Sequence, residues 1–539
     1  MADPLGRMLR ALFPAPCARA STLAMAAAMT FDTATTGMEQ KMTRATPLWL
    51  LVGLQGGISA ASLVVEIVAG RMLAPHVGMS LYTWTAVIAI VLAGFSAGHW
   101  WGGRLAEKPA NNALAWTGGA MLAAALTTAG AVLILPLVAG PVLSVVTSPV
   151  WGITVLTTLV FFLPSFFAGV PAPVLAQIAV DTAERSGPAL GAMFASGAVG
   201  AIAGTLLAGF LFIGWLGSAL TLVVVTLLYI ASGLLFFWLA RSRAFGLAVL
   251  AGAAAAGMAG LALAAPAQCE EETRYFCLRV DDLSADPNSP VHLMVIDHLA
   301  HGISARYLPQ VQFTPHGAML DHLSRLRAPR ADFSTYVIGG GSFSVPRSLL
   351  AQGAGAMTVS EIDPEVTQMA AEDFWFDLSR ADIWHEDARR ALLTRPEAMF
   401  DIVIGDAFTD VVAPVHLVTR EFFELIASHM TPDGSFLMTV IDYEDRLAAL
   451  GSIVLTLREV FPVVEVWTHA VQPAPGARMV FAVVAGAAPT PVDEFTAPAP
   501  DMTVFGALGD RFVTQLADAR GMVLTDDYAP IDRLMGRRD

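Results

Sequence analysis

Residues 335–344 read TYVIGGGSFS, an apolar run that ends on Gly339, Gly340 and Gly341. The short, β-branched run predicts a buried strand, and the helix-like stretch VPRSLLAQG follows the loop directly. Glycines after a strand allow a tight turn and let a nucleotide approach the backbone closely. Ser344 stands where the dinucleotide-binding fingerprint has its third glycine, so that fingerprint is incomplete. The stretch therefore predicts a strand–loop–helix unit that can bind a nucleoside.

Similar strand-like runs flank this unit, at 292–297, 356–363, 400–408 and 434–442, and they alternate with helical stretches. Such alternation is typical of βαβ units around a parallel sheet, where ligands bind beyond the carboxyl ends of the strands. We expect a Rossmann-like nucleoside-binding domain over 331–539. A small β-rich lobe over 266–330 is expected to precede it.

Glu361 is the first acid of interest, because it follows the next strand, about twenty residues after Gly341. A carboxylate at that place can accept hydrogen bonds from both ribose hydroxyls. The chain has no GxxxxGK[ST] motif, and its lysines are Lys41 and Lys108. Chemistry centred on phosphates is therefore poorly supported, and a sulfonium-adenosyl ligand, which has no phosphate, fits better.

The N-terminal half has a different character. The chain of 539 residues is 55% hydrophobic and 14% charged, with a mean hydropathy of +0.60, whereas soluble proteins carry about 25% charged residues. Residues 1–265 hold 11 Lys and Arg against 7 Asp and Glu, and residues 266–539 hold 20 against 39. We expect a disordered segment over 1–46 and a transmembrane helical domain over 47–265. Seven spans are predicted: 48–70, 83–103, 113–137, 150–174, 189–213, 219–240 and 245–265.

Positive charges flank alternate spans, which predicts a multi-pass protein of the inner membrane with its N-terminus inside and its acidic domain outside. The cytoplasmic origin of S-adenosyl compounds argues for the opposite side, and one span more or fewer would reverse the prediction. Cys269 and Cys277 follow the last span and form either a disulfide, in an oxidising compartment, or two free thiols.

Ionisable groups within the spans are candidates for function. Glu66, Arg71 and His99 together form either a polar site for a cation or a structural set, in which Glu66 pairs with an arginine and Arg71 reaches the interface. Gly200 and Gly204, in GxxxG spacing, predict close helix packing inside the bundle.

Six motifs occur in an order and spacing that carry a family resemblance. They are VIGGGSFSVPRSLL (337–350), SEIDPEV (360–366), HEDARRALL (385–393), FDIVIGDAF (400–408), HLVTREFFELI (416–426) and TDDYAP (525–530). Over about 290–535 the chain resembles the spermidine synthase (polyamine aminopropyltransferase) family, and more closely its bacterial members fused to an N-terminal membrane bundle. The resemblance implies a Rossmann-like fold of the S-adenosylmethionine-dependent methyltransferase type.

The resemblance also implies roles for individual residues. The three glycines would pass under the nucleoside, Glu361 would hold its ribose, and Asp387 would hold the adenine amino group. Asp406 would be the catalytic acid that takes a proton from the attacking amine. The other implied residues are Ser342, Ile362 and Ala388 for the nucleoside, and Asp410 and His316 for the amine. Tyr528 either lines the substrate pocket at the catalytic centre or merely ends a strand.

Departures from the family pattern leave the reaction open. Ser342 and the bulky Phe343 stand in the loop that reads GGGDGG in the family, whose Asp contacts the ammonium of the aminopropyl group. The family's second amine-binding acid lies three residues after the catalytic one, and Asp410 lies four after Asp406. In the segment QFTPHGAMLDHL (312–323), His316 or His322 replaces the family's Tyr and Gln, or both are structural.

The leading hypothesis is a membrane-anchored transferase that uses decarboxylated S-adenosylmethionine or S-adenosylmethionine. Its favoured reaction is the transfer of an aminopropyl group to an amine. Methyl transfer, another reaction of the sulfonium, and a polyamine transporter or sensor with a regulatory nucleoside-binding domain are the alternatives. The expected partners are a small cationic amine and the lipid bilayer, with a homodimer left open. Metal is not expected, and nucleic acid is not, because phosphate binding needs a basic face.

Overall fold

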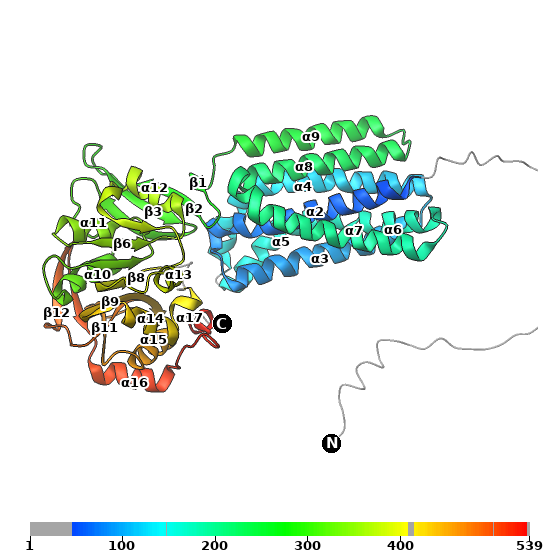
Figure 1. Ribbon diagram of the computed structural model, residues 1–539. Coiled ribbons are helices and arrows are strands. Elements are labelled where there is room, and N and C mark those ends of the chain that lie inside the picture. The colour runs from blue at the N-terminus through cyan, green and yellow to red at the C-terminus, as the bar shows by residue number, and fades with distance from the viewer. Residues whose placement is uncertain (1–45, 147, 408–413, 500, 536–539) are drawn as a thin grey trace, which may run out of the picture. The chain divides into compact units, whose positions relative to one another are not determined.

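The computed structural model describes residues 46–146, 148–407, 414–499 and 501–535 (Figure 1). Apart from Thr46, the segment expected to be disordered lies outside the described residues. Apolar helices make up the described chain as far as Ala264, and an α/β region follows. The membrane helices and the α/β region are therefore treated in turn.

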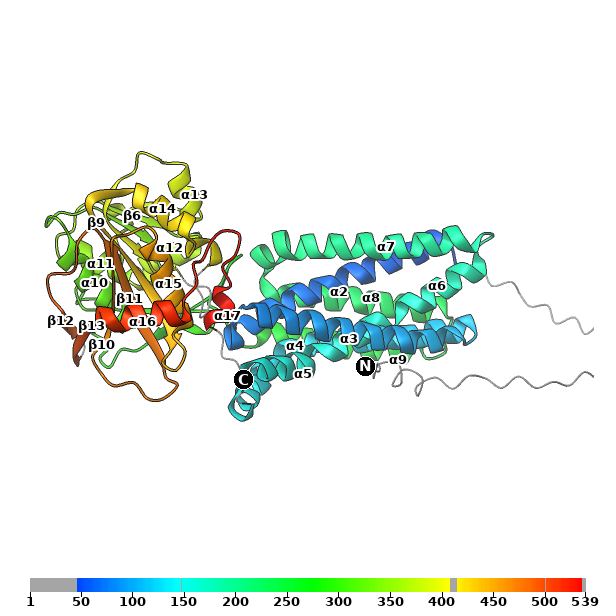
Figure 2. The same ribbon diagram turned by 90° about the horizontal axis from the view of Figure 1, so that it is seen from below.

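In the described part of the apolar region the regular elements are all helices, joined by short connections, and they run side by side in both views (Figures 1 and 2). They are α2 (Leu48–Val77), α3 (Leu81–Ala106), α4 (Ala110–Val145), α5 (Pro149–Gly169), α6 (Pro171–Thr182), α7 (Ser186–Leu207), the π-helical η1 (Ala208–Phe212), α8 (Ile213–Leu239) and α9 (Phe245–Ala264). Six stretches among the described residues are long and apolar enough to cross a membrane. The expected all-helical apolar bundle is therefore present, with helices of the length and composition that crossing a membrane requires.

The difference between six stretches and the seven expected spans lies in the stretch Ser186–Leu239, which has 54 residues. At 1.5 Å per residue it would be about 80 Å long, more than twice the hydrocarbon core. Gly217 interrupts it with non-helical backbone (φ 69°, ψ 175°). The two parts correspond to the fifth and sixth predicted spans, which are joined by a glycine break instead of a loop.

Small residues set the distance between α7 and α2. A Cβ at Gly200 would collide with the backbone of Gly56, and one at Gly204 with the backbone of Ala60. The GxxxG spacing thus lets two helices of the same bundle approach closely, as expected.

The α/β region begins with a four-stranded antiparallel sheet in the order β1-β2-β3-β4. Its strands are β1 (Glu271–Glu272), β2 (Cys277–Asp282), β3 (Val291–Ile296) and β4 (Leu299–Ala305). Val366, Met369 and Phe374 of the following domain pack against this sheet. A disulfide joins Cys269 to Cys277, so the first of the two alternatives for these cysteines is the one present.

A nine-stranded sheet forms the centre of the region, in the order β12-β13-β10-β11-β9-β8-β5-β6-β7. Its first strands are β5 (Thr335–Ile338), β6 (Met357–Ser360), β7 (Asp382–Trp384), β8 (Phe400–Gly405) and β9 (Met430–Tyr443). These five are parallel, as the βαβ pattern predicted. The expected Rossmann-like fold of the methyltransferase type is confirmed.

The rest of the sheet is antiparallel, which the sequence reading had not anticipated. It contains β10 (Val463–His469), β11 (Arg478–Gly486), β12 (Glu494–Ala499) and β13 (Asp501–Ala507). Short connections join β10 to β11 and β12 to β13, and short connections permit only antiparallel pairing. The sheet is therefore mixed.

Helices cover both faces of this sheet (Figure 1). One face packs against α10 (Pro315–Arg327) and α11 (Ser344–Ala351). The other packs against helices that follow β7: α13 (Ala388–Leu393), η3 (Val415–Leu417), α14 (Arg420–Ser428), α15 (Ala448–Arg458), α16 (Asp510–Arg520) and α17 (Ile531–Met535). Two further elements, α12 (Pro364–Asp373) and η2 (Leu378–Arg380), lie between β6 and β7 in the chain and contribute Ala370 and Leu378 to the core of the first face. Burial on both faces leaves the strand ends as the place for a ligand.

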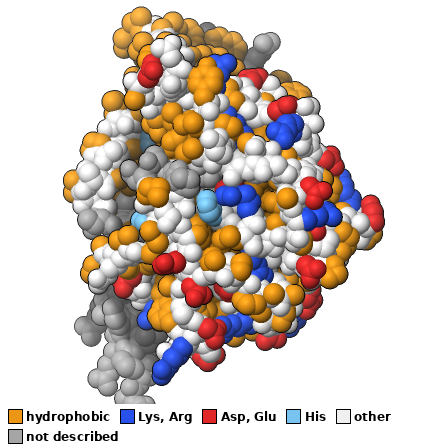
Figure 3. All heavy atoms as spheres, turned by 90° about the vertical axis from the view of Figure 1, so that its left-hand side faces the viewer, with side chains coloured by type: hydrophobic (Ala, Val, Ile, Leu, Met, Phe, Trp, Pro, Cys, Tyr) orange, Lys and Arg blue, Asp and Glu red, His pale blue; other side chains and the backbone are white. Residues whose placement is uncertain are grey.

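The surface of the α/β region carries charges of both signs. Figure 3 shows acidic and basic side chains intermixed over the face it presents, with apolar side chains between them. The excess of acid in residues 266–539 is therefore spread over this face and is not gathered into one patch.

Candidate active site

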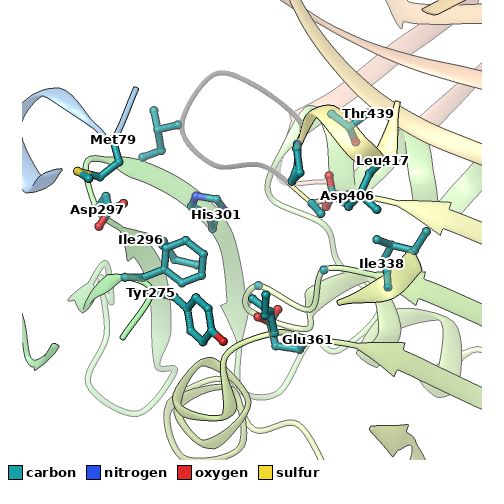
Figure 4. Close-up of a pocket in the computed structure, with 18 of the residues that line it drawn as sticks. Met79, Tyr275, Ile296, Asp297, His301, Ile338, Glu361, Asp406, Leu417 and Thr439 are labelled. Carbon is teal, nitrogen blue, oxygen red and sulfur yellow. The ribbon is translucent and has the colours of Figure 1, made fainter. Parts of the chain in front are cut away.

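A cavity of about 530 Å³ lies at the carboxyl ends of the parallel strands (Figure 4). Strands β5, β6 and β8 each contribute the residues that follow them. Of the residues predicted for the site, the cavity is lined by Gly339, Gly341, Glu361, Ile362, Asp387, Ala388, Asp406 and His316. Segments separated by up to ninety residues in the chain thus meet at one place, as expected of strand-end residues.

The glycine loop is shaped by close contacts. Gly339 has φ 89° and Gly341 has φ 50°, both in the region that favours glycine. A Cβ at Gly339 would lie 2.9 Å from the carbonyl oxygen of Asp406, so the loops after β5 and β8 touch here. Phe343 is fully buried beside Phe376, with ring centroids 4.7 Å apart, and this packing fixes the loop to the core.

Glu361 is held at the loop by both carboxylate oxygens. Gly340 donates its N–H to Oε2 (2.8 Å), and Asp363 donates its N–H to Oε1 (3.0 Å). The side chain is 6% exposed, and burial raises its pKa, while the N–H groups of Asp363 and Gly340 oppose that shift. Its orientation is therefore set before any ligand binds.

Asp387 occupies the N-cap of α13. Its Oδ1 accepts the N–H of Arg390 (3.0 Å), and its Oδ2 lies 2.6 Å from Nε2 of His416. An N-cap carboxylate is favoured by the unpaired N–H groups of the first helical turn. The next residue, Ala388, is buried and lines the cavity beside the acid.

Asp406 follows β8, and its N–H donates to the carbonyl of Ile338 (2.9 Å). Burial raises the pKa of its carboxyl, while positive charge on His316 and the hydroxyl of Thr439 oppose that shift. An acid whose pKa is raised toward neutrality is suited to accept a proton. Nearby, burial together with His316 and His298 lowers the pKa of His301 to about 4.

Other predicted residues lie elsewhere. Gly340 donates its N–H to Glu361 and is not among the residues that line the cavity. Ser342 is 1% exposed and faces Gly302 of β4, so its side chain does not reach the cavity. Tyr528 is 53% exposed in a turn and is not among the lining residues. His322 stacks on Phe495, away from the cavity. Asp410 lies outside the described residues.

The cavity has walls that the sequence reading missed. Thr439 lies beside Asp406, and Tyr275 and His301 lie on the opposite side of the cavity (Figure 4). Met79, between α2 and α3, and Trp84, in the first turn of α3, also line it. Thr439 belongs to the predicted strand 434–442, and its place in that strand could have pointed to it, whereas no motif marks the other four.

The three ionisable residues of the predicted spans do not come together. Arg71 donates to the carbonyls of Thr273 and Tyr275 and lines the cavity described above. His99 lines another cavity, of about 660 Å³, between the membrane helices, and Glu66 is buried in α2 and lines neither.

Comparison with known proteins gives these residues a family context. Residues 318–494 match the family model of the spermine/spermidine synthase domain. A polyamine aminopropyltransferase of Vibrio vulnificus (strain CMCP6) is 32% identical over 120 residues, which are 22% of this chain and 38% of that protein. An N-terminal histidine N-methyltransferase of Emericella nidulans is 29% identical over 156 residues, 28% of this chain and 27% of that protein.

Among solved structures, a probable spermidine synthase from Corynebacterium glutamicum ATCC 13032 is 18% identical, with a TM-score of 0.40 over 47% of this chain and 94% of that one. The matched stretches span less than half the length of the two curated relatives. Residues 318–494 are therefore similar to a spermine/spermidine synthase domain, and the family resemblance of the motifs is confirmed.

Proposed function

We propose that this chain is a membrane-anchored transferase whose donor is an S-adenosyl sulfonium compound and whose acceptor is an amine. The observation that carries the proposal is the convergence of Gly339, Glu361, Asp387 and Asp406 on one cavity inside a spermine/spermidine synthase domain. The enzyme domain would comprise 331–539, with 266–330 as its N-terminal lobe and 47–265 as its membrane domain.

The donor would bind along the strand ends. Glu361 accepts hydrogen bonds from the ribose hydroxyls, and Asp387 accepts one from the adenine amino group. The glycine loop allows the nucleoside to lie against backbone, with Ile362 and Ala388 beside it. The donor is a co-substrate and not a resident cofactor. For aminopropyl transfer, the first candidate reaction, it is decarboxylated S-adenosylmethionine.

The chemistry would take place beside Asp406. The amine nitrogen attacks the carbon next to the sulfonium, the carbon–sulfur bond breaks, and its electron pair stays on sulfur. Asp406 accepts the proton that the amine loses, with His316 on the same side of the cavity. Since the sulfonium carbon is already activated, positioning of the two reactants supplies much of the remaining rate.

Methyl transfer from S-adenosylmethionine is the second candidate, because Ser342 does not supply the acid with which the family binds the aminopropyl ammonium. Ser342 points away from the cavity and is not placed to bind the ammonium of either donor. One of the relatives is a methyltransferase by name. Both candidates share the nucleoside-binding residues and differ in the group that leaves sulfur.

We also propose that the protein lies in the cell membrane with its enzyme domain outside. The charge pattern of the loops supports this orientation. The disulfide between Cys269 and Cys277 supports it as well, since disulfides persist in oxidising compartments. A reporter fused to the C-terminus and active on only one side of the membrane tests the orientation. The small amine and the lipid bilayer are the proposed partners, and a homodimer stays open.

The test of function uses the purified full chain in lipid nanodiscs. Each of the two adenosyl donors is incubated with a panel of mono-, di- and polyamines, and the products are read by mass spectrometry. We expect an aminopropylated amine and methylthioadenosine, formed by the wild type and not by Asp406→Asn. A methylated amine would establish the second candidate instead. Absence of product with either donor, together with amine uptake that Glu66→Gln abolishes, would replace the enzyme by a transporter.

A further inference from the structure

A loop outside the six sequence motifs connects the membrane helices to the nucleoside site. We call residues 269–277 the clasp loop, because the disulfide between Cys269 and Cys277 closes it at both ends. It lies between α9, the last membrane helix, and β2. Its closure leaves few conformations available to the residues inside, so contacts at one side of the loop constrain the other.

The first side of the clasp loop is bonded to the membrane helices. Arg71 of α2 donates from Nη1 to the carbonyl of Tyr275 (2.6 Å) and from Nη2 to the carbonyl of Thr273 (3.0 Å). Glu272 accepts the N–H of Ser218 in α8 (2.8 Å). Arg71 is 9% exposed, and a buried charge without such partners would be strongly destabilising. Two membrane helices therefore fix this loop by charge-assisted hydrogen bonds.

The second side is bonded to the residues that hold Glu361. The hydroxyl of Thr273 donates to Oδ2 of Asp363 (2.5 Å), and Oδ1 of Asp363 accepts the N–H of Glu365 at the start of α12 (3.1 Å). The N–H of the same Asp363 donates to Oε1 of Glu361 (3.0 Å). Burial raises the pKa of Asp363, and the Thr273 hydroxyl opposes that shift most strongly.

These contacts form one continuous path of four hydrogen-bonded residues from α2 to the site: Arg71, Thr273, Asp363 and Glu361. Asp363 is 1% exposed, so water cannot take the place of the Thr273 hydroxyl. Without that hydroxyl, one carboxylate oxygen of Asp363 loses its partner, and the side chain must turn or take up a proton. Either change moves the N–H that orients Glu361.

We infer that Thr273 and Arg71 are positioning residues for the nucleoside, so that the membrane helices form part of the donor site. The inference rests on the proposed use of Glu361 to bind the donor's ribose. It gives the membrane domain a role beyond anchoring, because the affinity for the donor then depends on a membrane helix. Arg71 and Tyr275 also line the cavity, which places the path at its wall.

The test measures nucleoside binding to the full chain in nanodiscs, by calorimetry with methylthioadenosine and with S-adenosylhomocysteine. Thr273→Val removes the hydroxyl and keeps the shape, and Thr273→Ser keeps the hydroxyl. We expect Thr273→Val to raise the Kd on the order of tenfold, as for the loss of a hydrogen bond to a charged group. Thr273→Ser should stay within about twofold of the wild type, and Arg71→Met should behave like Thr273→Val.

A matched control separates positioning from general loss of structure. Thr490 is also buried, and its hydroxyl donates to Oε2 of Glu465 (2.6 Å), but neither residue lines the cavity. Thr490→Val should lower the melting temperature and leave the Kd unchanged. The double variant Arg71→Met with Thr273→Val should bind no more weakly than the weaker single variant, because both residues act along one path.

The outcomes are distinct. If the wild type binds the nucleosides and Thr273→Val binds them equally tightly, the positioning role is overturned and the proposed function stands. Weakening by Thr490→Val to the same extent would also overturn it, because the effect would then be one of stability. If the wild type binds no adenosyl compound at all, the proposed function fails, and the inference fails with it.

Discussion

The ends of β6 and β8 lie on the same cavity and present their acids differently. Glu361, after β6, has both carboxylate oxygens engaged by backbone N–H groups. Asp406, after β8, has its own N–H bonded to Ile338, while its carboxylate faces the cavity beside Thr439 and His316. A carboxylate held by N–H groups is fixed and is suited to binding, whereas a less supported one in a desolvated place is suited to proton transfer.

The largest effect is expected from a substitution of the acid after β8. Asp406→Asn keeps the size of the side chain and removes the proton acceptor. We expect kcat to fall by about 10³-fold, within the range of general-base catalysis. The Kd for methylthioadenosine should change little, since the nucleoside contacts lie elsewhere. A loss of nucleoside affinity with kcat unchanged would contradict the assignment, and single-turnover kinetics with calorimetry measures both.

The complementary change is at the β6 end. Glu361→Gln places an amide where two backbone N–H groups now donate, so one of them faces another donor. We expect the donor Kd to rise about tenfold to a hundredfold, with a smaller effect on the rate at saturating donor. If Glu361→Gln lowered kcat as strongly as Asp406→Asn does, the division into a binding acid and a proton-accepting acid would be wrong.

The pH dependence follows from the direction of the Asp406 shift. Because burial raises the pKa of this acid and the base must be unprotonated, kcat should fall as the pH drops through the raised pKa. The fall should be about tenfold per pH unit below it, and Asp406→Asn should show a flat profile. A wild-type profile that is flat down to the ordinary Asp range would show that Asp406 is not the base. Initial rates in nanodiscs at constant ionic strength measure it.

The smallest expected effect is on stability. An acid whose pKa is raised in the folded state destabilises the fold when it ionises, so this cost grows as the pH rises through the shifted pKa. Asp406→Asn should therefore be about 1 kcal/mol more stable than the wild type at neutral pH. The gain should vanish below the unfolded-state pKa. Thermal unfolding at both pH values measures it, and an equal gain at both would indicate a packing effect.

The sequence predicted much of the site, because strand-end residues report on the sheet. In a parallel sheet, each residue after a strand must lie at one edge, so Gly339, Glu361 and Asp406 could be brought together without coordinates. Asp387 was found through the motif that contains it. Tyr528 was placed by a motif as well, but the structure puts it in an exposed turn away from the cavity.

The contributions of His301 and Tyr275 could not be found this way, because no motif contains either residue. Thr439 lies in a predicted strand, but the side of a strand that faces a cavity depends on its register. Ser342 shows the opposite error, since its position in the loop suggested contact with a ligand. The positive φ of Gly341 and the burial of Phe343 turn it toward Gly302 instead.

What the sequence determined by itself is therefore local: an apolar half long enough to cross a membrane, a glycine loop after a strand, and acids at strand ends. These follow from hydropathy, periodicity and spacing, which act between neighbours in the chain. The tertiary structure alone decided the antiparallel half of the sheet, the break at Gly217 and the path from Arg71 to Glu361. Such features arise from contacts between residues as many as 204 positions apart, and no local pattern records them.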